Sequence, residues 1–252
     1  MASYLITGTS RGIGLAMADM LATKPASEIS VIFAAARTET DELKQLVVKA
    51  DGRVKLIKID VTDESSAKAA AGEVGKLLNG NGLDVLVNNV GIINFTPDGI
   101  ENMTDLESSF TTNVTSTHLV TSAFLPLLKK GSLKKVVNIS TTLGSIKMSP
   151  TYSLFPVPAY KISKAALNML TVQYALSFKD QGFTFLAISP GWVRTNLGGK
   201  TADLSVEQSS QAVLDIIFRA TTAENGKFFN VRVPGWEKAE GLNQYDGAEV
   251  PW

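Results

Sequence analysis

A tyrosine and a lysine stand four residues apart in the segment Ala159–Leu167, and together they could move a proton. Pro156 and Pro158 come just before them, and because proline favours the first turn of a helix, we expect a helix to begin near Pro158. Residues i and i+4 share one helix face, so Tyr160 and Lys164 would point the same way. An ammonium group beside a phenol lowers the phenol's pKa from its ordinary value of about 10, which would let Tyr160 exchange a proton with a carbonyl oxygen. The same spacing also occurs on ordinary amphipathic helices whose long side chains reach for solvent, so the rest of the chain has to decide.

A glycine-rich turn near the N-terminus could hold the phosphates of a dinucleotide. Tyr4–Thr7 is a short apolar strand, residues 8–14 read GTSRGIG, and residues 15–22 have a helix-forming composition. A turn between a strand and a helix presents backbone N–H groups and the positive end of the helix dipole to an anion. Glycine suits the positions where the chain turns tightly or where a ligand approaches the backbone. The expected cofactor contacts in this turn are Gly8, Ser10, Arg11, Gly12, Ile13 and Gly14.

The end of the second expected strand indicates which cofactor is bound. Ile29–Ala35 runs into Ala36-Arg37-Thr38, with no acidic residue at the strand end. In dinucleotide-binding folds an acidic residue at this place bonds the ribose 2′-hydroxyl of NAD, whereas an arginine accommodates the 2′-phosphate of NADP. Arg37 therefore favours NADP(H), and Arg11 could reach the same phosphate. The alternative is that both arginines are solvated surface residues.

Apolar strands alternate with helical segments along the whole chain, which is typical of a parallel sheet with crossover helices. Further strands are expected at Val54–Ile59, Leu83–Val87, Lys135–Ile139, Thr184–Ile188 and Lys227–Val231. Further helices are expected at residues 63–78, at residues 101–128 with an end near Pro126, from residue 158, and at residues 205–220. The sequence contains no internal repeat and no linker. We therefore predict one α/β domain over residues 1–252, a doubly wound, seven-stranded parallel sheet with helices on both faces.

Composition narrows the classes of function. The chain has 24 basic and 24 acidic residues, so neither a nucleic-acid-binding face nor a polybasic membrane face is expected. It has no cysteine and a single histidine, His118, which excludes thiol chemistry and multi-histidine metal sites, and we expect no metal. The first residues read as a strand rather than a signal peptide, and no apolar run approaches the ~20 residues of a membrane span. A cytoplasmic protein is expected.

Taken together, these motifs resemble those of the short-chain dehydrogenase/reductase family over essentially the whole chain. The resemblance rests on Thr7-Gly8-x-x-x-Gly12-Ile13-Gly14, Asp60-Val61, Asn88-Asn89-Val90-Gly91, Asn113, the hydroxyl cluster 140–145, Tyr160-x-x-x-Lys164 and Pro190-Gly191. Residues 139–146, residues 190–195 and the Tyr245-Asp246-Gly247…Trp252 ending look like those of sniffer-type carbonyl reductases and of secondary-metabolite ketoreductases.

The resemblance implies hydride transfer between NADPH and a ketone or aldehyde. In this family Tyr160 would donate the proton, Lys164 would lower its pKa and hold the nicotinamide ribose, and Asn113 would position a water that relays protons to Lys164. Further cofactor contacts would come from Asp60, Val61, Asn88, Val90, Gly91, Pro190, Gly191, Val193 and Thr195. Relatives pair the helices that carry Asn113 and Tyr160 with a second copy, so a homodimer or homotetramer is expected. The apolar residues of the helix that carries Tyr160, such as Leu167 and Met169, could equally belong to the core of one chain.

Two departures from the family pattern affect the substrate end of the site. The usual serine lies three residues before the glycine of the hydroxyl turn, which here is Thr141, whereas Ser140 would point to the other face by strand alternation. We favour Thr141 as the catalytic hydroxyl and keep Ser140 as the alternative. The segment between Gly144 and Tyr160 is longer than in common family members. With Trp192 and Leu197 it would line an apolar pocket, which suggests an apolar or aromatic carbonyl substrate.

Two other functions remain open on the sequence alone. One is a nucleotide-binding sensor or signalling protein that kept the fold and lost turnover. The other is an NAD-dependent alcohol dehydrogenase, which requires the opposite cofactor preference. The first is disfavoured because Tyr160 and Lys164 are both present, and the second because Arg37 follows the second strand.

Overall fold

Seven parallel strands form one sheet in the computed structural model, which describes residues 1–252. The strand order is β3-β2-β1-β4-β5-β6-β7, and every neighbouring pair is parallel. The strands are β1 (Ala2–Thr7), β2 (Ile29–Ala36), β3 (Val54–Lys58), β4 (Val85–Asn88), β5 (Lys135–Ile139), β6 (Thr184–Ser189) and β7 (Phe228–Asn230). The predicted seven-stranded parallel sheet is therefore confirmed. The strand order reverses between β1 and β4, which is where such sheets bind ligands.

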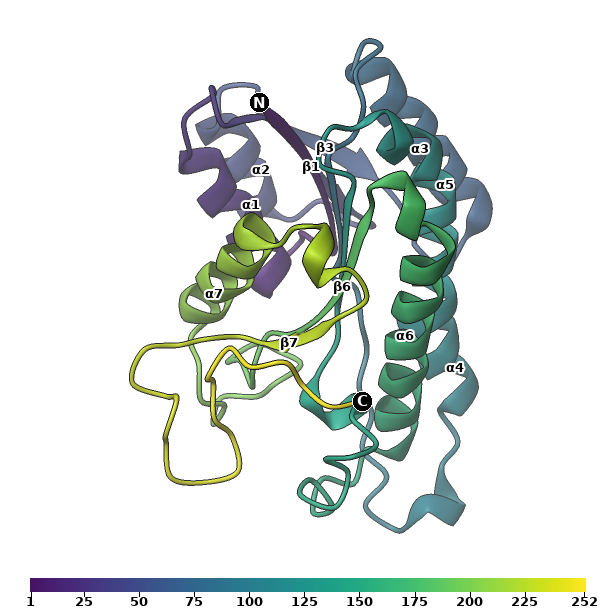
Figure 1. The fold of residues 1–252 in the computed structure, drawn as a ribbon, viewed down its shortest axis with the longest axis vertical. Coiled ribbons are helices and arrows are strands. Elements are labelled where there is room, and N and C mark those ends of the chain that lie inside the picture. Colours follow the sequence, from purple (N-terminus) through teal and green to yellow (C-terminus); the bar gives the residue numbers. More distant parts are fainter.

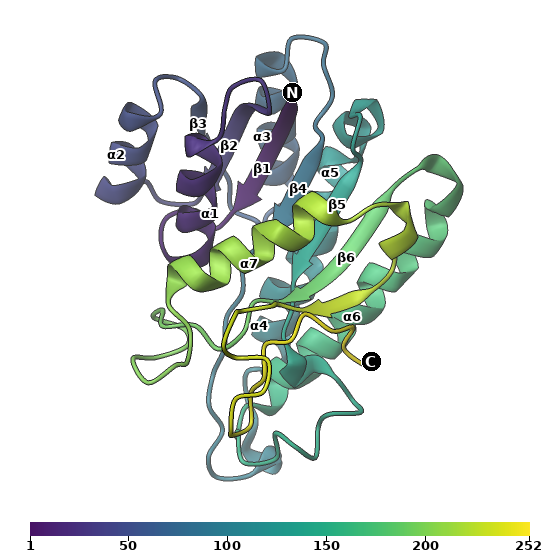
Figure 2. The ribbon, with the colours of Figure 1, turned by 60° about the vertical axis from the view of Figure 1, so that its left-hand side comes forward.

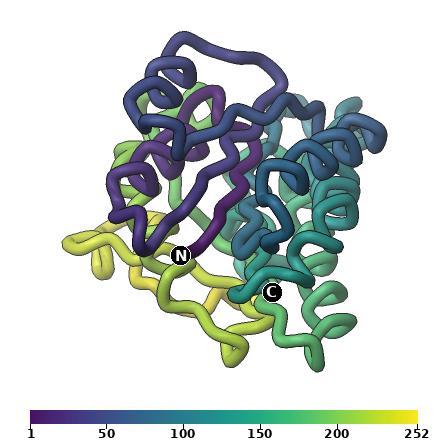
Figure 3. The backbone as a smooth tube through the Cα atoms, turned by 90° about the horizontal axis from the view of Figure 1, so that it is seen from above, coloured from purple at the N-terminus to yellow at the C-terminus, as the bar shows by residue number.

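Helices cover both faces of the sheet (Figures 1 and 2). They are α1 (Gly12–Thr23), α2 (Asp41–Lys49), α3 (Glu64–Leu77), α4 (Leu106–Phe110), α5 (Ser116–Lys130), α6 (Pro158–Ser177) and α7 (Val206–Arg219). Helices α1, α2 and α7 pack on one face, and α3, α5 and α6 pack on the other. Seen from above in Figure 3, α5 and α6 in teal and green lie on the opposite side from α1 in purple. None of the helices combines the length and apolar character of a membrane span.

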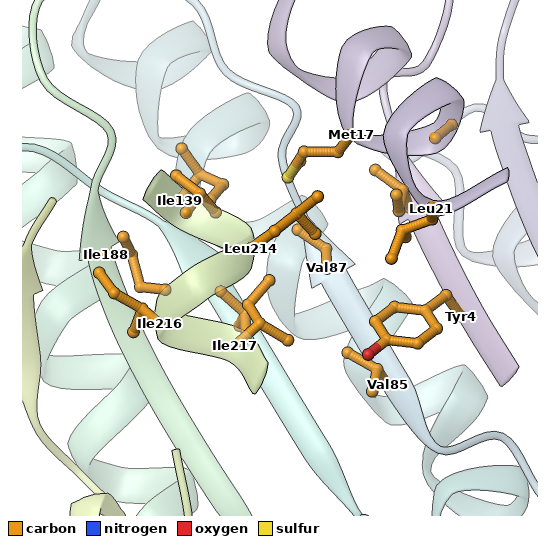
Figure 4. Close-up of a cluster of buried hydrophobic side chains, with 14 of the residues drawn as sticks. Tyr4, Met17, Leu21, Val85, Val87, Ile139, Ile188, Leu214, Ile216 and Ile217 are labelled. Atoms are coloured by element: carbon orange, nitrogen blue, oxygen red, sulfur yellow. The ribbon is translucent and has the colours of Figure 1, made fainter. Parts of the chain in front are cut away.

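Alternate residues of each strand enter two separate cores. Tyr4 and Ile6 of β1 pack under α1 and α7, whereas Leu5 between them packs with α3 and α5. Figure 4 shows the first core, where Met17 of α1 and Leu214 of α7 meet the side chains of the central strands. Because both faces of the sheet are covered, its central strands are apolar along most of their length, and this made them recognisable in the sequence.

The structure corrects the predicted helices in two places. A helix that the sequence analysis did not predict, α2, begins after Thr40, whose side chain accepts a hydrogen bond from Leu43 N. The helix predicted over residues 101–128 begins only at Leu106, because residues 100–102 form a separate 3-10 turn and residues 103–105 are not helical. It contains a wide π-helical turn at Thr111–Thr115 and continues past Pro126 to Lys130. Pro126 removes one backbone hydrogen bond, but burial of Phe124 and Leu128 on either side of it keeps the segment helical.

Helix α6 faces the sheet with one side and solvent with the other. Its buried residues include Tyr160, Lys164 and Leu167, while Met169 is 59% exposed. The loops that follow the strands all lie at the carboxyl edge of the sheet, toward the lower part of Figure 1. Helix α6 begins at this edge, so its first turns stand beside those loops.

Candidate active site

A cleft of about 990 Å³ opens at the carboxyl edge of the sheet. It brings together residues from the turns after β1 to β6 and from the C-terminal segment. Of the predicted site residues, those that line it are Gly8, Ser10, Arg11, Gly12, Ile13, Arg37, Asp60, Val61, Val90, Gly91, Ser140, Thr141, Tyr160, Lys164, Pro190, Gly191, Val193 and Thr195. Three predicted residues, Gly14, Asn88 and Asn113, do not line the cleft.

The turn between β1 and α1 leaves the start of the helix open toward the cleft. Gly8 and Gly12 adopt left-handed backbone conformations, with φ of +71° and +60°. No side chain caps α1, and its first turn carries no acidic residue. Its first N–H groups are therefore free for an anion. Gly14 contributes by packing instead, since a Cβ atom there would lie 2.5 Å from the Gly8 carbonyl oxygen.

Two arginines without an ion-pair partner lie in the part of the cleft beside the start of α1. Arg11 and Arg37 both line the cleft and are exposed, and neither forms a salt bridge. Asp60 lies nearby, and its pKa is held below the ordinary value mainly by hydrogen bonds from Thr62, with a smaller contribution from the Arg37 charge. Both guanidinium groups are thus available to a negatively charged ligand.

The two adjacent asparagines after β4 have different surroundings. Asn88 donates to Thr121 Oγ1 at 3.0 Å and to Asn138 Oδ1 at 2.9 Å, so it joins β4 to α5 and β5. The Asn88 side chain is therefore directed away from the cleft, and its predicted contact with the cofactor stays a prediction. Its neighbour Asn89 lines the cleft and donates to the Thr7 carbonyl at 3.0 Å. Strand alternation is the signal that separates the two.

Asn113 lies in the π-helical turn and fixes the loop that follows β4. Its Oδ1 accepts from Ile92 N at 2.8 Å, and its Nδ2 donates to Ile92 O and to Ser163 Oγ, both at 3.0 Å. A Cβ atom on Gly91 would lie 3.3 Å from Asn113 Oδ1 and 3.5 Å from Lys164 Nζ. The asparagine thus lies behind the cleft wall, beside Lys164, where its side chain holds the loop in place.

Tyr160 and Lys164 lie together on the buried face of α6. The Lys164 Nζ donates to the Ile139 carbonyl at 2.7 Å and lies 5.7 Å from the centre of the Tyr160 ring. Burial lowers the pKa of Lys164 to about 8 and raises the pKa of Tyr160. The predicted lowering of the Tyr160 pKa is therefore not found in this structure, because burial removes the phenolate from water and so disfavours it. No protein group bonds the Tyr160 hydroxyl, which lines the cleft.

The two hydroxyl residues after β5 have different partners. Ser140 is buried, and its Oγ donates to Asn168 Oδ1 of α6 at 2.6 Å. The Thr141 Oγ1 accepts from Leu143 N at 3.2 Å, so its own proton remains available to a ligand. Of the two hydroxyls, Thr141 is the one that can donate to a substrate oxygen.

Aromatic side chains form the wall of the cleft beyond these groups. Tyr152 and Phe155 come from the long segment before α6, and Phe155 meets Trp192 edge-on with ring centres 6.1 Å apart. Leu197, from the loop after β6, also lines the cleft and is 43% exposed. Ile146 and Leu154, from the long segment before α6, do not line the cleft and are largely exposed. Of the segment 145–155 that was predicted to line an apolar pocket, only Tyr152 and Phe155 line the cleft, together with Trp192 and Leu197.

The C-terminal segment adds Tyr245, which the sequence analysis noted as part of a family-like ending but did not count among the site residues. The Tyr245 hydroxyl donates to the Asp203 carboxylate and accepts from Trp192 N at 3.2 Å. Gly191 has a φ of +82°, and a Cβ atom there would lie 2.9 Å from the Tyr245 ring. Tyr245 thus holds the loop after β6 against the C-terminal segment. No local pattern in the sequence indicates a contact across 42 residues.

Comparisons with known proteins agree with this geometry. The family model for short chain dehydrogenases matches residues 3–204. An uncharacterised oxidoreductase of Schizosaccharomyces pombe is 31% identical over 99% of this chain and 97% of its own. The NADPH-bound carbonyl reductase from chicken fatty liver superposes with a TM-score of 0.86 at 31% identity, covering 100% of this chain and 99% of that one. The carbonyl reductase Sniffer of Drosophila melanogaster gives a TM-score of 0.86 at 27% identity over 100% of both chains.

Proposed function

This chain belongs to the short-chain dehydrogenase family of oxidoreductases, and we propose that it is an NADPH-dependent carbonyl reductase. One observation carries the proposal: Tyr160, Lys164 and Thr141 meet in the same cleft whose other end holds an uncapped helix start and two unpaired arginines. The first group suits proton transfer to a carbonyl oxygen, and the second suits a phosphorylated dinucleotide. The NADPH bound to the chicken carbonyl reductase supports the same assignment.

The residues of the cleft beside the start of α1 fit the phosphates of NADPH. The pyrophosphate would lie against the turn from Gly8 to Gly12, where the backbone is open and the first N–H groups of α1 have no cap. Arg37 and Arg11 would hold the 2′-phosphate, since both are exposed at the cleft and neither is paired. An acidic residue, which would repel that phosphate, is absent from the end of β2.

The bound dinucleotide would supply the hydride, and the residues of the chain would handle the carbonyl oxygen. Tyr160 would donate its proton to that oxygen, and Thr141 would donate a hydrogen bond to it. The raised pKa of Tyr160 keeps the phenol protonated before reaction. Proton transfer is still favourable, because an alkoxide is a far stronger base than a phenolate. Lys164, one helical turn away, would stabilise the phenolate that remains.

The aromatic wall determines the class of substrate that we propose. Tyr152, Phe155 and Trp192 line the substrate end. Arg194 also lines the cleft, and its Nη1 donates to the Ala202 and Asp203 carbonyls, which ties this side chain to the loop after β6. A small, apolar or aromatic ketone or aldehyde would bury its surface against these rings.

Absorbance of NADPH provides the test. The purified protein is assayed with NADPH and with NADH against diketones, quinones and aromatic aldehydes, beside the Tyr160→Phe protein. We expect oxidation of NADPH with at least one carbonyl compound, weaker use of NADH, and loss of turnover in Tyr160→Phe with NADPH binding retained. A protein that binds NADPH but reduces none of these compounds would contradict the proposal and favour a sensor role.

A further inference from the structure

Asn168 is a buried polar residue of α6 that the reaction proposed above does not use. It follows Tyr160 and Lys164 at successive steps of four residues, so the three side chains share one helix face. All three are buried, and Asn168 is 3% exposed. A buried amide is costly unless its hydrogen bonds are made, so its partners indicate what it holds.

The Asn168 amide bonds both ends of the turn that carries Thr141. Its Oδ1 accepts from Ser140 Oγ at 2.6 Å, and its Nδ2 donates to the Gly144 carbonyl at 3.3 Å. Thr141 lies between these two residues. One turn earlier on α6, Lys164 Nζ bonds the Ile139 carbonyl at 2.7 Å. The segment from Ile139 to Gly144 is therefore attached to the helix face that carries Tyr160.

The turn also packs against α6 without space between them. A Cβ atom on Gly144 would lie 2.8 Å from Lys164 Cβ and 2.9 Å from the Lys164 carbonyl carbon. Real side-chain atoms do not approach so closely, so only glycine permits this contact. Packing fixes how near the turn lies to α6, and the two Asn168 hydrogen bonds fix its position along the helix.

Thr141 has little freedom of its own to correct an error in that position. Its backbone is extended, with φ of −166° and ψ of 151°, and its Oγ1 accepts from Leu143 N within the same turn. The direction of the hydroxyl is thereby fixed relative to the turn. Any movement of the turn along α6 moves the Thr141 hydroxyl relative to the Tyr160 phenol.

We infer that Asn168 is a positioning residue, which acts through Ser140 and Gly144 to hold the Thr141 hydroxyl beside the Tyr160 phenol. The inference rests on the proposed function, because it assumes that both hydroxyls meet the same carbonyl oxygen. It also gives Ser140 a role: its hydroxyl is the link between Asn168 and the turn, and it does not contact substrate.

The experiment is a double-mutant cycle between the link and the hydroxyl that it positions. Ser140→Ala and Asn168→Ala are each made in the natural protein and in Thr141→Val, which removes the hydroxyl and keeps the shape. In the natural protein each change should lower kcat about 10- to 100-fold, because displacing a reacting group by up to about 1 Å has an effect of this size. The KM for NADPH should stay unchanged. In Thr141→Val neither change should lower kcat further. Ser140→Thr, which keeps the hydroxyl, should retain kcat.

A matched control separates positioning from loss of stability. Asn225 also uses its amide for two hydrogen bonds, accepting from Phe185 N at 2.8 Å and donating to the Ala175 carbonyl at 3.0 Å, and it does not line the cleft. Asn225→Ala should lower the melting temperature without lowering kcat.

Three results would overturn the inference. Ser140→Ala could leave kcat unchanged, or it could lower kcat by the same factor with and without the Thr141 hydroxyl, as a general structural effect would. Full activity of Thr141→Val would remove the group to be positioned. Failure of the proposed function is a different result, in which the natural protein reduces no carbonyl compound.

Discussion

The amine of Lys164 lies 5.7 Å from the centre of the Tyr160 ring, yet its protein hydrogen bond goes to the Ile139 carbonyl. The two groups are neighbours whose ionisation is governed by burial: the pKa of Lys164 falls and that of Tyr160 rises. Burial of both groups thus favours a neutral pair. This makes the pair sensitive to pH in a direction that can be worked out.

The first prediction concerns the stability contributed by Lys164. Its pKa is about 8 in the folded protein and 10.5 for an ordinary lysine, so from pH 8 upward the unfolded chain binds more protons at this residue than the folded protein does. The free energy of unfolding therefore rises with pH in this window. From pH 7 to pH 10, urea unfolding should show the natural protein gaining about 2 to 3 kcal/mol relative to Lys164→Met.

The difference from Lys164→Met should level off above pH 10, where the unfolded lysine also loses its proton. In each of the two proteins Tyr160 then has an opposite effect, which cancels from the difference. Above that pH the unfolded chain loses the Tyr160 proton, while the folded protein keeps it because burial raises that pKa. The folded state then binds more protons, and stability falls with pH. A difference between the natural protein and Lys164→Met that stays constant from pH 7 to pH 10 would contradict the assigned direction of the Lys164 pKa.

The second prediction concerns the proton donor. Tyr160→Phe removes only the hydroxyl from a buried ring that lines the cleft. Loss of a general acid costs about 10²- to 10⁴-fold in rate, so kcat should fall by that factor, while the Kd for NADPH measured by fluorescence should change less than about threefold. Tyr174→Phe is the control, because Tyr174 is on the same helix and its hydroxyl bonds His118, away from the cleft. Equal kcat values for Tyr160→Phe and the natural protein would remove Tyr160 from the reaction.

The sheet and most of the cleft were predictable because their signals are local. Strands of a parallel sheet are buried on both faces, so β1 and β4 to β6 stand out as apolar runs, and the turns after them carry the glycines and polar residues of the cleft. Strand alternation also indicated that Ser140 and Thr141 face opposite ways, and in the structure only Ser140 bonds α6. The same reasoning applied to Asn88 and Asn89 would have selected Asn89 as the one that lines the cleft.

What the sequence did not reveal depends on contacts between distant segments. Helix α2 is short, and its N-terminal cap Thr40 also donates to the Ser10 carbonyl, a contact that no local pattern predicts. Pro126 ordinarily ends a helix, but the core holds α5 together around it. The pKa of Tyr160 likewise depends on how deeply the folded cleft buries it, and the spacing of Tyr160 and Lys164 contains no information on burial.

The third prediction concerns cofactor preference. Arg37 lies at the cleft beside the end of β2 and has no ion-pair partner, so its charge is available to the 2′-phosphate of NADPH. Arg37→Asp replaces attraction by repulsion and provides a carboxylate for the 2′-hydroxyl of NADH. The KM for NADPH should rise about 100-fold, which corresponds to about 2.7 kcal/mol, while the KM for NADH should rise by much less or fall. A lower KM for NADPH in Arg37→Asp would show that the 2′-phosphate binds elsewhere.

The last prediction concerns Tyr245, which joins the loop after β6 to the C-terminal segment. Its hydroxyl donates to Asp203 and accepts from Trp192 N, and its ring packs where a Cβ atom on Gly191 would lie. Tyr245→Phe keeps the ring and leaves the Asp203 carboxylate without this donor, although Asn243 still donates to it at 2.8 Å. The free energy of unfolding should fall by about 1 to 3 kcal/mol.

The kinetic effect of Tyr245→Phe should appear mainly in binding. Trp192 forms part of the aromatic wall, and its backbone loses a partner in this variant, so the KM for the carbonyl substrate should rise several-fold while kcat changes little. Asp203→Asn is the matched variant, because it keeps an acceptor for the Tyr245 hydroxyl and should have a smaller effect. A large loss of kcat with an unchanged KM would mean that this contact controls the chemical groups on α6 and does not shape the substrate wall.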